Sequence, residues 1–256
     1  LPVLIRGLKD DRKDLNRVKT IIGIPGHWKD RYELLESLVK QKILFAGNVL
    51  RDLETETTIQ AEVYPYDSDL AMAFYYASNG TISEKELNQI HEHTHTLYLI
   101  FESVDTKELL NVLRLGSKIL HAGGLAVKVE TSGIAHSKEK WLALTEEPGE
   151  IALYRALVSK IEGNQCYYSC GMHQFGLRDA MVQDNLLGQE SANQLLDGFL
   201  LYLLIEKPSI QAGHTFSLDP QSPVYRIDET ACTFYPPDDL FFNPRGYWTL
   251  SRLDQI

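Results

Sequence analysis

The stretch Thr20-Ile-Ile-Gly-Ile-Pro-Gly-His-Trp-Lys-Asp-Arg-Tyr-Glu33 decides the class of fold, because it places a strand directly before a helix. Its first five residues form an apolar run that predicts a buried strand. Pro25-Gly26 indicates where that strand ends. Asp30, followed three residues later by Glu33, matches a capping box and predicts a helix over 31–40.

Two later runs predict strands that pair with each other. The apolar run Ile43–Val49 is typical of a central strand, and Thr58–Tyr64 alternates apolar and polar residues as a half-buried strand does. The segment 51–57 between them predicts a β-hairpin. Helical and strand patterns interleave along the rest of the chain. We therefore expect an α+β (mixed α/β) protein, with a mixed sheet, packed helices and at least one β-hairpin.

The length of the chain, 256 residues, is enough for one large domain or two small ones. Residues 1–19 are rich in charge and predict an exposed lead-in. Residues 20–256 contain no linker, so we expect a single α+β domain, with 145–149 as the place for a softer boundary. The first residue is Leu1 and not methionine, which is compatible with a piece of a longer protein.

Composition argues against two classes of partner. Lys and Arg number 25 against 35 Asp and Glu, a formal net charge of −10, and no basic run is present. Phosphate backbones attract concentrated positive charge, so we expect no nucleic-acid partner. The longest apolar run, Phe199–Ile205, is too short to span a bilayer, so we expect no membrane partner. Three cysteines suit a reducing compartment and predict a cytoplasmic protein.

The segment His91-Glu-His-Thr-His95 is the densest cluster of imidazoles. On a strand, His91, His93 and His95 would share one face and could bind a metal such as zinc. At a helix end only His91 and His95 would be neighbours. A solvated polar connection is the simpler alternative, and the sequence does not require any cofactor.

The segment Cys166-Tyr-Tyr-Ser-Cys-Gly-Met-His173 suggests a thiol site. Cys170 is a candidate nucleophile, with His173 as its base and a glycine amide for an oxyanion. On a strand, Cys170 and His173 point to opposite faces, so the pair needs a local bulge or another base, such as His136. The two cysteines could instead join Cys232 and His173 around zinc, or simply fill the core.

Glu130 is a candidate acid or base for the same chemistry. It ends the predicted strand 125–130 beside a glycine turn, and His136 follows that turn. Lys128 points to the same side of the strand as Glu130, so a surface ion pair between these two residues is the simpler explanation.

The tripeptide His27-Trp-Lys29 lies between the first strand and its helix. Backbone amides at such a position, with the side chains of His27 and Lys29 nearby, could bind an anion. The segment lacks the glycine pattern of a phosphate or dinucleotide loop. His27, Trp28 and Lys29 are candidate ligand-binding residues, with a plain strand-to-helix turn as the simpler alternative.

Six motifs are spread over most of 20–250. They are Ile24-Pro-Gly-His-Trp28, Phe45-Ala-Gly-Asn-Val-Leu50, Ala122-Gly-Gly-Leu-Ala-Val-Lys-Val-Glu130, Ser132-Gly-Ile-Ala-His-Ser137, Tyr167-Tyr-Ser-Cys-Gly-Met-His173 and Asn243-Pro-Arg-Gly-Tyr-Trp248. Together these motifs resemble an uncharacterised bacterial family known as domain of unknown function 4261. The resemblance implies a bacterial, cytosolic protein and carries no activity and no catalytic residues. The histidine triplet is not part of it.

These patterns favour a module that binds a protein or a small molecule, because no acid–base pair, triad, phosphate loop or strong metal spacing is present. The alternative is a metal- or thiol-dependent hydrolase that uses His136, Cys170 and His173, with Glu130. An aromatic stretch over 64–76 adds a homo-oligomer as a third expectation, since aromatic side chains are favoured at interfaces as well as in cores.

Overall fold

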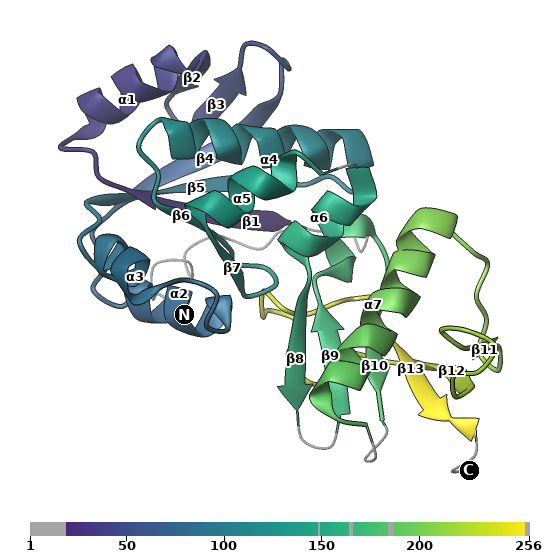
Figure 1. Cartoon of the computed structure of the whole chain (residues 1–256). Helices are drawn as coiled ribbons and strands as arrows, with labels where there is room; N and C mark the ends of the chain where they lie inside the picture. Colours follow the sequence, from purple (N-terminus) through teal and green to yellow (C-terminus); the bar gives the residue numbers. More distant parts are fainter. Residues whose placement is uncertain (1–18, 148, 164–165, 184–186, 254–256) are drawn as a thin grey trace. The chain divides into compact units, whose positions relative to one another are not determined.

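The structure, a computed structural model, describes residues 19–147, 149–163, 166–183 and 187–253. Those residues form two sheets, one antiparallel and one mixed, and seven α-helices (Figure 1). The predicted α+β class with packed helices and hairpins is confirmed. Among the described residues, no helix combines the length and the apolar character needed to cross a bilayer.

The chain divides into two compact units, Leu1–Ala156 and Leu157–Ile256. The division falls at the end of helix α6 (Gly149–Leu157). The expectation of a single domain over 20–256 stays a prediction, and each unit is described by itself below.

The first unit is built on a seven-stranded antiparallel sheet in the order β2-β3-β4-β5-β1-β6-β7. Its strands are β1 (Thr20–Gly26), β2 (Ile43–Ala46), β3 (Val49–Asp52), β4 (Thr58–Pro65), β5 (His95–Phe101), β6 (Ala126–Val129) and β7 (Ile134–Ser137). Besides α6, its helices are α1 (Arg31–Lys40), α2 (Leu70–Ser78), α3 (Glu84–His91), α4 (Thr106–His121) and α5 (Lys138–Thr145).

Helices cover both faces of this sheet, with α1, α4 and α5 on one face and α2 and α3 on the other (Figure 1). Phe74 of α2 and Ile90 of α3 pack in one cluster with Ala126 and Ala135 of the sheet. On the opposite face, Trp141 of α5 donates a hydrogen bond to a carbonyl of α4. Burial on both faces explains why the central strands β1 and β5 are almost continuously apolar.

The predicted strand over Ile43–Val49 is wrong in one respect, because the structure divides it in two. β2 and β3 form a hairpin around Gly47 and Asn48, and Gly47 has a φ of 61°. Glycine adopts a positive φ without strain, so it accepts a tight turn inside an apolar run. β3 then pairs with β4, and β2 becomes an edge strand.

The second unit contains a six-stranded mixed sheet in the order β11-β12-β13-β10-β9-β8. Only β10 and β13 run parallel among its described pairs. Helix α7 (Gln189–Glu206) packs against β9 and β10. The strands are β8 (Ser159–Gly163), β9 (Cys166–Cys170), β10 (Asp179–Val182), β11 (Thr215–Phe216), β12 (Tyr225–Thr230) and β13 (Tyr247–Arg252).

A buried carboxylate, Asp179 at the start of β10, ties three segments of this unit together. Its Oδ1 accepts hydrogen bonds from Ser169 Oγ at 2.8 Å and from the Met172 amide at 3.1 Å. Its Oδ2 accepts one from Asn243 Nδ2 at 2.7 Å. These donors come from β9, from a short 3-10 helix and from the loop before β13, so one side chain fixes the relative position of all three.

Replacing this carboxylate should destabilise the protein strongly. Asp179→Ala leaves three buried donors without their acceptor, and we expect a loss of roughly 3–5 kcal/mol in the free energy of unfolding. The matched control is Asp197→Ala, which removes a half-exposed ion pair with Lys160 and should cost no more than about 1 kcal/mol. Urea unfolding of both variants measures the difference, and equal losses would contradict the role given to Asp179.

A candidate ligand pocket around Trp28

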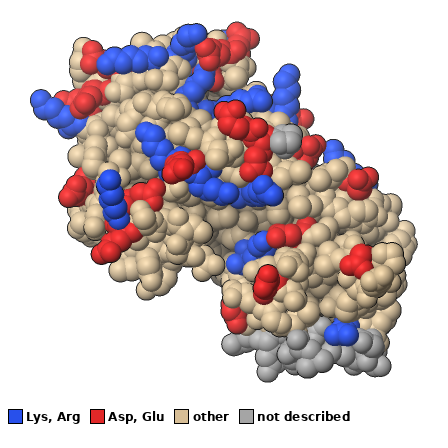
Figure 2. Space-filling model, in the orientation of Figure 1, with Lys and Arg blue, Asp and Glu red and all other residues tan. Residues whose placement is uncertain are grey.

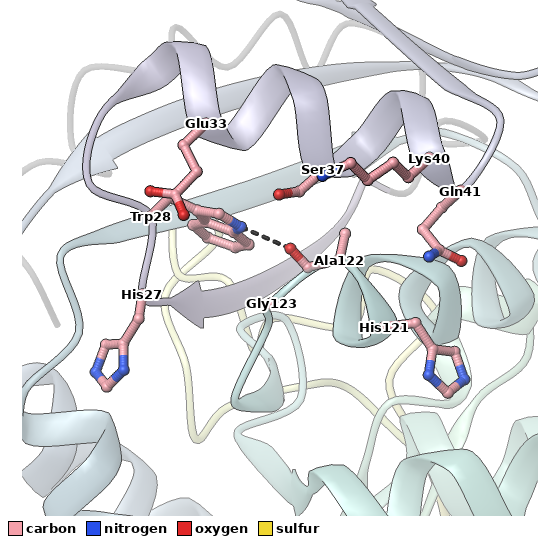
Figure 3. A pocket seen from close by; sticks show the side chains of 9 residues that line it. All are labelled: His27, Trp28, Glu33, Ser37, Lys40, Gln41, His121, Ala122 and Gly123. Carbon is pink, nitrogen blue, oxygen red and sulfur yellow. Dashed lines mark hydrogen bonds between the residues drawn. The ribbon is translucent and has the colours of Figure 1, made fainter.

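A pocket of about 270 Å³ lies in the first unit between helix α1 and the C-terminal end of α4 (Figure 3). Trp28 lines it between these two helices, and His27 and His121 lie at its opposite ends. Two of the three predicted ligand-binding residues, His27 and Trp28, therefore line a real hollow. The side chain of Lys29 is not among the lining groups. The full lining is His27, Trp28, Glu33, Ser37, Lys40, Gln41, His121, Ala122 and Gly123.

Trp28 occupies its place because two glycines leave room for its ring. A β-carbon on Gly26 would lie 2.3 Å from the ring, and one on Gly123 would lie 2.8 Å from Nε1. The indole Nε1 donates to the carbonyl oxygen of Ala122 at 2.8 Å (Figure 3). The side chain is only 1% exposed, so it forms a rigid wall of the pocket.

The backbone of the predicted anion site is already occupied by other partners. The Trp28 amide donates to Thr94 Oγ1 at 2.9 Å, and the Lys29 amide donates to Glu33 Oε2 at 2.7 Å. Asp30 caps α1 as the sequence predicts, by accepting a hydrogen bond from the Glu33 amide. The amides of Trp28 and Lys29, which could have bound an anion, therefore already donate to other groups. The Glu33 carboxylate beside them would also repel an anion.

Most polar side chains of the pocket are, in contrast, without a partner among the described residues, the exception being Glu33, whose Oε2 accepts from the Lys29 amide. Within the described residues, those of His27, Ser37, Lys40, Gln41 and His121 make no hydrogen bond or ion pair. Sequence reasoning missed the contribution of α1, because a polar helix face normally indicates solvent. The available signal was spacing, since three polar residues of α1 and its C-cap residue, at i, i+4, i+7 and i+8, share one face: Glu33, Ser37, Lys40 and Gln41.

The predicted histidine triplet is distributed over three kinds of structure. His91 ends α3, His93 lies in the following turn, and His95 begins β5. His93 is buried, its Nδ1 donates to the Ile90 carbonyl at 2.7 Å, and its Nε2 accepts from the Asp67 amide at 3.2 Å. Burial lowers the pKa of His93, which agrees with a neutral ring. Both of its nitrogens are engaged, so the three rings do not form a common ligand set.

More widely, no three His, Cys, Asp or Glu side chains gather as metal ligands in the described part of the chain.

Cys170 lies in the second unit and is fully buried at the end of β9. The strand stops there because Gly171 has a φ of 132°, and Met172–Phe175 forms a 3-10 helix. Burial, and after it the Asp179 carboxylate, raise the pKa of the Cys170 thiol well above its usual value. A thiol held in this protonated form is a poor nucleophile.

His173 is buried in the same unit, with Nδ1 3.9 Å from Asp179 Oδ2. Neither ring nitrogen has a hydrogen-bond partner among the described residues. His173 is therefore near a carboxylate but beyond hydrogen-bonding distance of it.

Glu130 lies in the first unit and forms an ion pair with Lys128, which is the simpler of the two explanations that the sequence allows. Unlike the surface pair of that explanation, the pair is buried, because Lys128 and Glu130 are 8% and 1% exposed. Gly23 leaves space for the Glu130 carboxylate beside the ring of Tyr98. Burial, and then the charge of Glu130, raise the pKa of Tyr98.

His136 also belongs to the first unit, on β7. Its Nε2 lies 3.0 Å from the Ala156 carbonyl oxygen, and a carbonyl only accepts, so this nitrogen carries the proton. Burial lowers the pKa of His136 to about 4. A joint site of His136, Glu130, Cys170 and His173 would have to span both units, and it stays a prediction.

Comparisons with protein-family models, with curated proteins and with solved structures find no match to this chain. The family resemblance of its six motifs therefore stays a prediction.

Gly26, which precedes the pocket residues His27 and Trp28, should not tolerate substitution by alanine. Gly26→Ala forces the Trp28 ring out of its place and weakens its bond to Ala122, so we expect a loss of about 2–4 kcal/mol in the free energy of unfolding. Gly188→Ala is the control, because a β-carbon there meets no atom within 4 Å. Denaturant unfolding gives the loss, and a Gly26→Ala protein as stable as the control would refute this account.

Stability should depend on the protonation of His136. Its pKa is about 4 in the folded chain and about 6.5 when unfolded, so the unfolded chain binds more protons between these values. The contribution is complete above pH 6.5 and is lost as pH falls toward 4, by roughly 3 kcal/mol in total. Urea unfolding from pH 4 to 7 should give a shallower pH dependence for His136→Gln. Identical slopes would contradict the assignment.

Proposed function

We propose that the first unit is a binding module for a small zwitterionic molecule, peptide-like in size, held in the Trp28 pocket. The observation that carries the proposal is the contrast within the lining. Trp28 is fixed by its packing and its bond to Ala122, while five polar side chains around it make no hydrogen bond or ion pair among the described residues, and Glu33 uses one carboxylate oxygen for the Lys29 amide. Preformed hollows with a few unpaired polar groups are the usual form of a ligand site.

The charges of the lining select the class of ligand. Glu33 and Lys40 are seven residues apart on α1, which places them roughly 10 Å apart along the helix axis. Figure 3 displays Glu33 toward the His27 end and Lys40 toward the His121 end. A ligand with an ammonium group at one end and a carboxylate at the other complements both. A simple anion is opposed by the Glu33 carboxylate, which is why the proposal departs from the anion expected at His27–Lys29.

The size of the pocket supports a molecule of two or three amino-acid residues. Its 270 Å³ lies just below the usual range of ligand sites, about 300–1,000 Å³. Ser37 and Gln41 add a hydroxyl and an amide between the charged ends, and both suit peptide groups.

The alternative function, a metal- or thiol-dependent hydrolase using His136, Cys170 and His173, has less support. Its thiol-dependent form needs a thiolate, whereas burial raises the pKa of Cys170, and it needs a basic imidazole, whereas burial lowers the pKa of His136.

A protein partner or self-assembly also stays a proposal. In α2, which carries no charged residue, Phe74 is buried in the core, whereas Met72, Tyr75 and Tyr76 are 57%, 51% and 74% exposed. These three side chains share one helix face, as residues at i, i+3 and i+4 do. Over the face shown in Figure 2, Lys and Arg are interspersed with Asp and Glu.

Binding of triglycine at low ionic strength tests the function. The chain has three tryptophans, so its indole N–H signals in a nitrogen-15 NMR spectrum are few and can be assigned by substitution. Triglycine should shift the Trp28 signal in a saturable way. Glu33→Gln and Lys40→Gln should each weaken binding about twofold to fivefold, because each removes one exposed charge pair. Glu36→Gln, on the same helix outside the pocket, should leave binding unchanged.

Two analogues identify which end of the ligand meets which residue. N-acetyl triglycine lacks the ammonium group and should be insensitive to Glu33→Gln. Triglycine amide lacks the carboxylate and should be insensitive to Lys40→Gln. A Trp28 signal that triglycine leaves unmoved, or equal responses to all three peptides, would overturn the proposal.

A further inference from the structure

A second and larger hollow, of about 820 Å³, lies within the second unit. Its walls are the last turns of α7, the segment 208–213 that follows this helix, and the edge strand β11 with its flanks (Figure 1). Tyr202, Ile210, Phe216 and Leu218 supply apolar surface to the hollow, and Ser209 and Thr215 supply hydroxyl groups. None of these residues was a candidate from the sequence.

The apolar wall of this hollow is anchored to α7. Phe216 packs edge-to-face on the buried Phe199 with ring centres 5.1 Å apart, and Tyr202 lies beside Phe216 at 5.9 Å. Leu218 sits over Gly198, where a β-carbon would lie 2.2 Å from its Cδ2 atom. Glycine inside a helix destabilises the helix relative to alanine. Its presence at position 198 is explained by the space that it leaves for the Leu218 side chain.

Three hydroxyl groups of the hollow are without a partner among the described residues, whereas Ser217, which also lines it, donates its hydroxyl to the Asp219 carbonyl at 2.6 Å. Within the described residues, the hydroxyls of Tyr202, Ser209 and Thr215 make no hydrogen bond. His214 uses only Nδ1, which accepts from the Gln211 amide at 3.4 Å. No Asp, Glu, Lys or Arg belongs to the lining that the structure describes.

This lining determines the charge and the shape of a fitting molecule. A charged ligand would lose hydration without meeting a counter-charge, which opposes its entry. Two neighbouring aromatic rings favour a planar ring that packs against them, and free hydroxyls favour a ligand with its own hydrogen-bonding group. The volume lies within the range of sites for small molecules.

We propose that this hollow in the second unit, here called the α7–β11 groove, binds an uncharged aromatic molecule that carries a hydrogen-bonding group. The α7–β11 groove is independent of the Trp28 pocket, because the groove lies in the other unit and the two share no residue.

Indole and indole-3-acetate are the probes that test the proposal, since they share a ring and differ by a carboxylate. Two-dimensional nitrogen-15 NMR of the whole chain follows both titrations. Indole should shift amide signals of 202–218 in a saturable way, with a dissociation constant near the millimolar range typical of such small ligands. Indole-3-acetate should bind at least fivefold more weakly.

Two variants with different risks localise the binding. Tyr202→Ala removes half of the aromatic wall and should weaken indole binding at least threefold. Thr215→Trp changes an exposed position and fills the groove without removing a packed side chain, so it should abolish the shifts in a folded protein. Tyr76→Ala, at an exposed tyrosine of the first unit, should change nothing.

Three results would overturn the assignment. They are the absence of indole shifts in 202–218, shifts that persist in the folded Thr215→Trp protein, and equal affinity for indole and indole-3-acetate.

Discussion

The packing of the Trp28 side chain is the constraint on which the first unit depends most directly. One side chain closes the space between β1, α1 and the end of α4, and its only polar atom is paired with the Ala122 carbonyl. The ring fits because Gly26 and Gly123 carry no β-carbon. A buried indole that is both packed and hydrogen-bonded leaves little freedom to its neighbours. The adjacent hollow therefore keeps its shape without a ligand.

Buried polar groups in this protein divide into those with complete hydrogen bonding and those without it. Asp179 accepts from three donors, and His93 uses both ring nitrogens. Buried groups with complete hydrogen bonding hold segments together, because removing one partner would leave the other groups buried without a hydrogen bond. His173 has neither nitrogen paired among the described residues, although it is equally buried. Its Nδ1 lies 3.9 Å from the Asp179 carboxylate, which is beyond hydrogen-bonding distance.

The sequence predicts the regular parts of the fold well because local rules govern them. Asp30 locates the start of α1 correctly, since its carboxylate accepts from the Glu33 amide, but the reciprocal bond of the predicted capping box is replaced by one from the Lys29 amide to Glu33 Oε2. The division of Ile43–Val49 escapes prediction, because Gly47 in an apolar run is compatible with a strand as well as a turn. Of the candidate site, His27 and Trp28 follow from their position after a strand. His121 and Lys40 do not, because only the tertiary fold brings α4 beside α1.

Both hollows adjoin a side chain that a glycine accommodates, and this shared feature bears on how ligands would bind. Gly26 and Gly123 make room for Trp28, and Gly198 makes room for Leu218. A glycine costs conformational entropy on folding, more than any other residue. The space left by these glycines lets Trp28 and Leu218 each form a fixed wall of its hollow before a ligand binds. A fixed wall needs no further ordering on binding, so even the few weak contacts that such small sites offer can give measurable affinity.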